Sequence, residues 1–205
     1  MKRRTLDLLF SIGGLALAVL LLVLGLVMKN NADFAKSYVK NQLSQQQITF
    51  TKAEFLAPPE KASSCLVANA GKLMNSGKQA ECYANDYIAL HLREAMEGGG
   101  FKGGTYATIG TPQRELAAQV KTATAANDPK LPELQTKLTA ISGLRDTAFK
   151  GETLRGLLLT SYGFSVFGEK ASQAELVALL AGLVLLLASL AGFFHWMKTP
   201  PEKTV

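Results

Sequence analysis

The two cysteines of the chain are the first residues whose type suggests chemistry. Cys65 and Cys82 both lie in the long polar segment between two apolar stretches, and that segment is expected outside the membrane. Disulfides persist in such compartments, so we predict a bridge that stabilises the fold by roughly 3 kcal/mol. Two regular antiparallel helices joined at Gly77 would place Cys65 opposite a residue beyond Cys82, so the bridge requires a short or bent first helix. Two independent buried thiols are the alternative, and the lack of a CxxC spacing argues against redox catalysis.

A histidine and two acidic residues could hold a metal ion. His91 and Glu94 stand three residues apart on a predicted helix, with Glu97 nearby. A zinc site needs three or four ligands, and the only other histidine, His195, lies in the second apolar stretch. We therefore predict no metal and no cofactor, and we expect His91 to be hydrogen-bonded locally.

Motifs typical of enzymes are not recognisable. The glycine-rich run 98–104 is followed by no GK[ST] and preceded by no strand pattern, so it predicts a mobile loop rather than a phosphate site. No serine stands in a GxSxG motif. The net charge of +6 is spread along the chain without interleaved aromatic residues, which argues against a nucleic-acid partner. The sequence thus predicts no catalytic residue and a protein that is not an enzyme.

Two long apolar stretches decide the architecture. Residues 8–28 carry no charge, and residues 176–197 carry only His195 as an ionisable group. Each spans roughly 30 Å as a helix, the thickness of the hydrocarbon core of a bilayer. The first stretch could instead be a cleaved signal peptide, but it is longer than a typical signal core, and residues 26–29 offer no small-x-small cleavage site. We therefore predict two transmembrane helices, 8–28 and 174–197.

Basic residues predict the orientation. They flank both stretches at the ends of the chain, at Lys2, Arg3, Arg4, Lys198 and Lys203. By the positive-inside rule both termini, 1–7 and 198–205, are cytoplasmic, and Trp196 is an interfacial anchor. The protein is then a two-pass protein of the cell membrane with the lipid bilayer as its first partner.

Small residues in the two stretches predict close packing of the helices. A small-xxx-small row runs along the second stretch, and the first has two small residues: Ala174, Ala178 and Gly182, with Gly14 and Ala18. Such rows let helices approach closely in lipid. The alternative is that alanine and glycine are simply common in membrane helices.

The segment 29–173 predicts an extracytoplasmic helical domain. Helices are expected at about 65–75 after a Ser63 or Ser64 cap, 78–97, 111–125 after a Thr111 cap, 132–149 and 154–167. Pro58-Pro59 should exclude a helix at that point. Gly168 should end the segment 154–167, and Ser172 should open the second span with a capping box. The segment 154–167 is too apolar to stay in water, so we expect it packed on the domain or on the membrane surface.

Four runs of the chain resemble a known group of proteins. They are residues 77–81, 83–92, 104–107 and 150–159, read together with the two flanking spans. The chain resembles small two-span actinobacterial membrane proteins of unknown function, some of which are labelled aromatic-ring-opening dioxygenase subunits. A non-haem iron enzyme of that kind needs several histidine and acidic ligands, and this chain has two histidines.

These inferences together predict an all-α protein with two transmembrane helices flanking an extracytoplasmic helical domain. The favoured function is an accessory or interaction subunit at the bacterial cell envelope, and a second membrane protein or a second copy of the chain is a candidate partner. The alternatives are a small-ligand sensor that signals through a membrane partner and, third, a membrane-surface enzyme.

Overall fold

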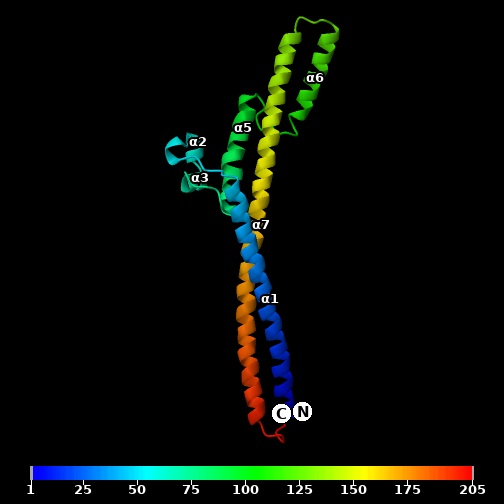
Figure 1. Ribbon diagram of the computed structural model, residues 1–205. Helices are drawn as coiled ribbons and strands as arrows, with labels where there is room; N and C mark the ends of the chain where they lie inside the picture. The colour runs from blue at the N-terminus through cyan, green and yellow to red at the C-terminus, as the bar shows by residue number, and fades with distance from the viewer. Residues whose placement is uncertain (1, 205) are drawn as a thin grey trace. The chain divides into compact units, whose positions relative to one another are not determined.

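The computed structural model describes residues 2–204, and all of its regular elements are helices (Figure 1). The elements are α1 (Arg3–Gln45), η1 (Ala53–Phe55), α2 (Pro58–Lys61), α3 (Ser64–Asn69), α4 (Gly77–Cys82), η2 (Tyr83–Ile88), α5 (Ala89–Gly98), α6 (Gly110–Ala125) and α7 (Leu131–Lys198). The described chain contains no strand, only isolated bridges from Lys2 to Thr204 and from Thr49 to Leu73. The predicted all-α class is confirmed.

The chain divides into two compact units. One, here called the hairpin unit, contains the residues up to Tyr38 and those from Phe164 onward. The other, the middle unit, is Val39–Gly163. The helices α1 and α7 are both long and apolar enough to cross a membrane, with mean hydropathies of 2.7 and 2.6 in their most apolar 18-residue windows.

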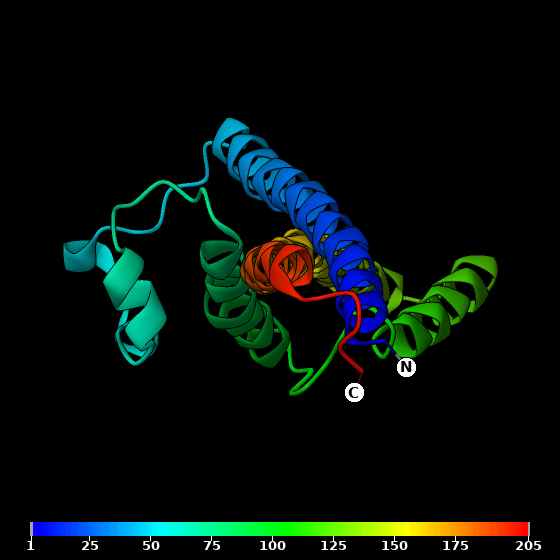
Figure 2. The same ribbon diagram turned by 90° about the horizontal axis from the view of Figure 1, so that it is seen from below.

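In the hairpin unit α1 and α7 lie side by side and antiparallel, as both views show (Figures 1 and 2). Glycines let the two backbones approach. A Cβ atom added to Gly182 would lie 2.9 Å from Leu22 Cγ and 3.2 Å from the carbonyl oxygen of Ala18. One added to Gly14 would collide with the hydroxyl of Ser189. Larger side chains at these positions would therefore force the helices apart.

The helix α7 is continuous where the sequence predicts three separate helices, at 132–149, 154–167 and 174–197. Gly168 does not end a helix, because its missing side chain makes room for the Cβ atom of Ala35, 2.8 Å from where a Cβ of Gly168 would be. Ser172 does not open one either, since its hydroxyl accepts a hydrogen bond from Lys36 at 3.4 Å inside the helix. Both predictions from capping signals are wrong, because the two residues serve contacts between helices instead.

The middle unit has a core built from its short helices and the adjoining ends of α1 and α7. The buried members are Val39, Leu43, Phe50, Leu66, Met74, Ala80, Cys82, Ala84, Ile88 and Leu158. Leu158 is only 3 % exposed, whereas its neighbour Leu157 is 62 % exposed. The apolar segment 154–167 thus buries one face in the core, leaves the other open, and is part of α7 rather than a separate helix.

The local signals for helix ends are partly correct. Ser63 caps α3, accepting the Leu66 N–H at 3.2 Å, as predicted. The prediction at Pro58-Pro59 is wrong, because α2 begins at Pro58, and the first turn of a helix tolerates proline. Thr111 is not a cap, since α6 already begins at Gly110.

The glycine-rich run turns the chain toward a segment that contacts α7. Gly100 and Gly103 adopt positive φ angles of 84° and 71°, which turn the chain sharply. The Tyr106 N–H donates to Glu152 at 2.9 Å, and the Arg145 guanidinium lies 4.3 Å from the Tyr106 ring centre. The segment that follows the glycines is therefore fastened to α7, and the mobility of the run itself stays a prediction.

Candidate functional site

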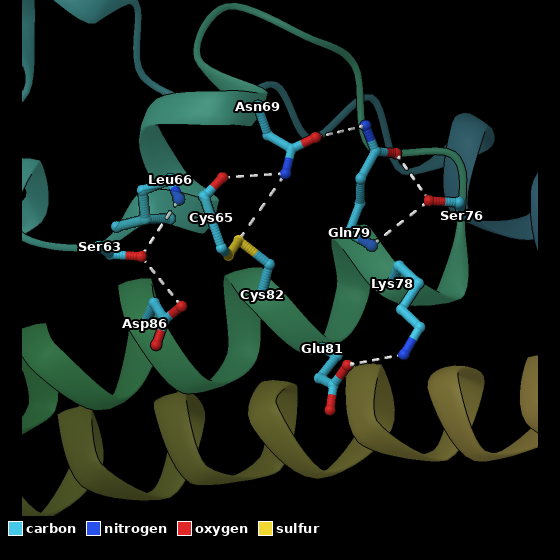
Figure 3. The surroundings of a disulfide bond; sticks show 10 residues. All are labelled: Ser63, Cys65, Leu66, Asn69, Ser76, Lys78, Gln79, Glu81, Cys82 and Asp86. Atoms are coloured by element: carbon cyan, nitrogen blue, oxygen red, sulfur yellow. Dashed lines mark hydrogen bonds and ion pairs between the residues drawn. A yellow bond between two sulfur atoms is a disulfide. The ribbon is translucent and has the colours of Figure 1, made fainter.

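The cysteine pair lies between two short helices. Cys65 is in the first turn of α3 and Cys82 is the last residue of α4, with their Cα atoms 6.0 Å apart, a disulfide distance (Figure 3). The helix α3 ends at Asn69 and is therefore short. A short first helix is what the sequence analysis required for a bridge between these two cysteines.

A polar network surrounds this pair (Figure 3). The Asn69 amide donates to the carbonyl oxygen of Cys65 at 2.9 Å and accepts from the Gln79 amide at 3.2 Å. On the other side the Ser63 hydroxyl donates to Asp86 at 3.0 Å. Among residues 2–204, Asp86 is the carboxylate that lies within 4.8 Å of both sulfurs, but paired sulfurs offer no thiolate to a metal. The arrangement fastens α3 to the adjacent helices.

The second cluster is centred on His91. Its Nε2 lies 3.1 Å from Glu60 Oε1 and its Nδ1 lies 3.4 Å from Glu94 Oε2. The Glu60 side chain is 5 % exposed, while those of His91 and Glu94 are 43 % and 47 % exposed. The second Glu60 oxygen accepts the Ala57 N–H at 2.7 Å, so both oxygens of this buried carboxylate are satisfied. The contact with Glu60 is at hydrogen-bond distance, and the longer contact with Glu94 lies at the exposed edge of the ring.

Two tyrosines extend this cluster along the same helical face. The rings of Tyr83 and Tyr87 stack with centres 4.6 Å apart, and the Tyr87 ring lies 4.4 Å from the imidazole of His91. Burial raises the pKa of Tyr83 to about 12, and the neighbouring Tyr87 and the Glu60 charge add to the shift. The tyrosines lie on η2, a π-helical turn, which the sequence did not predict.

This geometry does not suit a metal ion. The two carboxylates contact opposite nitrogens of His91, so they do not converge on one point, and a single ion could not take all three as ligands. Glu60 is the residue that sequence reasoning missed. It stands in the first turn of a helix opened by two prolines, where a glutamate commonly accepts a backbone N–H.

No family model matches this chain, and no curated protein or solved structure is detectably similar to it. Its function is therefore argued from its own geometry.

Polar contacts link the two helices at the chain-end side of the hairpin unit. The Arg4 guanidinium lies over the indole of Trp196, with its central carbon 4.9 Å from the centre of the Trp196 ring. His195 Nδ1 lies 2.8 Å from the carboxylate of Asp7, and the Thr199 hydroxyl reaches the same carboxylate at 3.5 Å. The predicted interfacial anchor thus lies within a polar cluster that joins the ends of α1 and α7.

The small residues named from the sequence lie at different exposures. Ala18 is fully buried and Ala178 is 8 % exposed, while Ala174 is exposed. Two contacting residues of α1 were not named from the sequence, Ser11 and Gly25. With Ala18 they recur every seven residues, at 11, 18 and 25, and this spacing is the signal that could have found them.

Four aromatic residues of the hairpin unit form an exposed surface, here called the aromatic patch. They are Phe34, Tyr38, Phe164 and Phe167, with exposures of 58, 49, 40 and 75 %. The Phe34 ring centre lies 5.5 Å from that of Tyr38 and 6.4 Å from that of Phe164, so three of them contact one another and still face outward.

Proposed function

We propose that this chain is a membrane-anchored extracytoplasmic helical module that serves as an accessory or interaction subunit at a bacterial cell envelope. In this proposal α1 and α7 cross the bilayer, residues 29–173 lie outside, and both ends are cytoplasmic. Low burial supports the anchoring, because only 17 % of each apolar window is buried inside the protein. A core helix of a soluble protein would be mostly buried. The resemblance to small actinobacterial membrane proteins stays a prediction.

The observation that carries the interaction role is the position of the aromatic patch. Charged residues separate it from the apolar runs: Lys29, Asp33, Glu169, Lys170 and Glu175. Charged residues avoid the hydrocarbon core. A bilayer position that covered the aromatic patch would place these charged residues in the hydrocarbon, so lipid does not cover the patch.

The patch also lies beyond the lipid headgroups. Tyr38 follows the end of the first apolar run, Met28, by ten residues, or about 15 Å of helix. Phe164 precedes the start of the second run, Leu176, by twelve residues, or about 18 Å. The headgroup layer adds only about 5–8 Å on each side of the hydrocarbon. Lipid therefore leaves most of these rings in water.

The occupant we propose is another membrane protein with an apolar surface that continues outward from the bilayer. Such a protein is held at the same membrane and reaches the height of the patch, whereas a freely diffusing protein would have no such alignment. Exposed aromatic clusters of this kind mark interaction sites.

Purification in a mild detergent tests this role. We expect the variant Phe34→Ser with Phe167→Ser to lose a protein that the wild type retains, while it accumulates normally in the membrane. Phe55→Ser is the matched control, because Phe55 is 71 % exposed and lies in the middle unit. Identical companions for all three proteins would refute the role. A wild-type dimer that the double variant loses would replace the partner with a second copy.

A reporter that is active only outside the membrane tests the topology. Fused after Val205, it should be silent, and fused at the exposed loop position Lys102 it should be active. Activity after Val205 would contradict the two-span arrangement.

The sensor alternative is favoured by one observation, a groove lined by two arginines in the middle unit. We propose no catalytic activity, because no catalytic motif is recognisable in the sequence.

A further inference from the structure

A groove of about 540 Å³ opens on the middle unit between α5, the loop 99–109 and α7. Its size is typical of sites for small molecules. Leu92 and Leu159 supply apolar wall, and Thr105 and Gly103 supply loop backbone. No residue of the proposed interaction surface contributes to it, so it is a separate feature.

Charge in this groove is unbalanced. Its ionisable members are Arg93, Arg155 and Glu152. Glu152 already accepts the Tyr106 N–H at 2.9 Å. Within residues 2–204 neither guanidinium has a carboxylate within 4.0 Å, since each ion pair is made by a lysine or a histidine. Two cations and one carboxylate thus line the groove, which leaves it a net positive charge, and neither guanidinium is paired with a carboxylate.

Arg155 is also incompletely satisfied. One terminal nitrogen donates to the Asn85 side-chain oxygen at 3.1 Å. Its Nε is buried and has no acceptor, and it is the one buried side-chain nitrogen or oxygen in this condition among the described residues. Unsatisfied buried donors are rare in folded proteins and are often explained by a missing ion or ligand.

We propose that this groove binds an anionic group, a phosphate or a carboxylate, through Arg93 and Arg155. The planar guanidinium matches both anions in a bidentate geometry. Leu92 and Leu159 then contact the apolar part of the ligand. This goes beyond the interaction role, because it gives the middle unit a ligand of defined chemistry.

The glycines of the loop fit this assignment. Gly103 has a φ of 71° and open space where a side chain would be, so its backbone faces the groove without obstruction. Gly104 is packed closely against Phe101, with 2.8 Å from an added Cβ to the Phe101 carbonyl oxygen. One glycine therefore leaves room for a ligand and the other fixes the loop.

Titration calorimetry of the full chain in phosphatidylcholine nanodiscs tests the proposal, with inorganic phosphate and hexanoate as probes. We expect at least one probe to bind, and Arg93→Gln and Arg155→Gln each to weaken it about tenfold. Lys121→Gln, which removes an equal charge from an exposed part of α6, should bind as the wild type does. Circular dichroism of each variant shows whether the fold is kept, and Arg93, being exposed, is the variant expected to keep it.

A second arm separates a soluble anion from a lipid headgroup. If the source is lipid, phosphatidylglycerol in the nanodisc raises the melting temperature of the wild type and not of the Arg93→Gln, Arg155→Gln double variant. The proposal is overturned if the wild type responds to neither phosphate, hexanoate nor phosphatidylglycerol. Equal responses of the folded double variant and the wild type would overturn it as well.

Discussion

Replacing Glu60 with alanine should destabilise the middle unit more than any change to its exposed carboxylates. The carboxylate of Glu60 is 5 % exposed and has a partner for each oxygen. Oε2 accepts the Ala57 N–H at 2.7 Å, and Oε1 lies 3.1 Å from His91 Nε2. The change removes both contacts and leaves the Ala57 N–H without its acceptor.

The magnitude follows from these two contacts. Hydrogen bonds to charged groups contribute about 1.5–3 kcal/mol each, which gives about 3–6 kcal/mol for the pair. Removing a buried carboxylate also removes its own desolvation cost, which offsets part of the loss. We therefore expect a net loss of about 2–4 kcal/mol, equivalent to a fall in melting temperature on the order of 10 °C for a unit of this size.

Thermal unfolding in mild detergent, followed by circular dichroism, measures the loss, and hydrogen exchange of residues 57–61 localises it. Glu94→Ala is the control, because Glu94 contacts the same histidine at 3.4 Å but is 47 % exposed. Exposed ion pairs contribute about 0–1 kcal/mol. If Glu60→Ala and Glu94→Ala melt at the same temperature, the buried carboxylate does not hold α2 in place, and the reasoning is wrong.

Three further predictions concern the same unit. Burial raises the pKa of Tyr83 from 10.0 to about 12. The stability that the neutral phenol contributes is therefore present below pH 10 and is lost as the pH rises toward 12. A melting series at alkaline pH should show that Tyr83→Phe stays stable over that range. Alkylation and mass spectrometry without reductant should find neither Cys65 nor Cys82 free, and reduction should cost roughly 3 kcal/mol; full labelling of both would show separate thiols. Leu158→Asp should prevent folding or membrane accumulation, because it puts a charge into the core. The control Lys121→Asp should change the stability little. Equal melting temperatures of the two variants would contradict the burial of Leu158.

The elements that follow from local sequence were predicted well. The long apolar runs gave two helices, and Ser63 gave the start of α3, because a capping hydroxyl needs only a backbone N–H three residues away. The same local reasoning failed at Gly168 and Ser172. Each is a signal for a helix end, yet each contacts the other long helix, and a contact 133 or more residues away is invisible to local reasoning. Competing helix contacts thus overrode the capping signals.

The candidate sites show the same limit. The sequence placed Cys65 and Cys82 in one segment, and the structure brings them to disulfide distance. For His91 the sequence offered only neighbours on its own helix, so Glu94 was named and Glu60 was missed. The contact with Glu60 depends on how the chain folds back at Pro58-Pro59. The spacing of apolar residues in the sequence does not predict that fold-back.

The two long helices illustrate why spacing has to be matched to geometry. The row of small residues four apart in the second span includes Ala174, which is an exposed position. Antiparallel helices that pack along their length meet every seven residues. Small residues at that interval or its double contact the other helix at Ser11, Ala18, Gly25 and Ala32 in α1 and at Gly168, Gly182 and Ser189 in α7.

This contact continues past the apolar runs. The close approach of Gly168 to Ala35 lies beyond the last apolar residue of the first run, Met28, and is flanked by the charged residues of that region. In lipid such a seam is held by packing, since burial from water contributes nothing there. In the topology that we propose, the part of the seam above the lipid would also remove apolar surface from water. The helices thus hold each other at the level of the aromatic patch, so the partner that we propose would meet a surface that is already formed and would lose little entropy in ordering it.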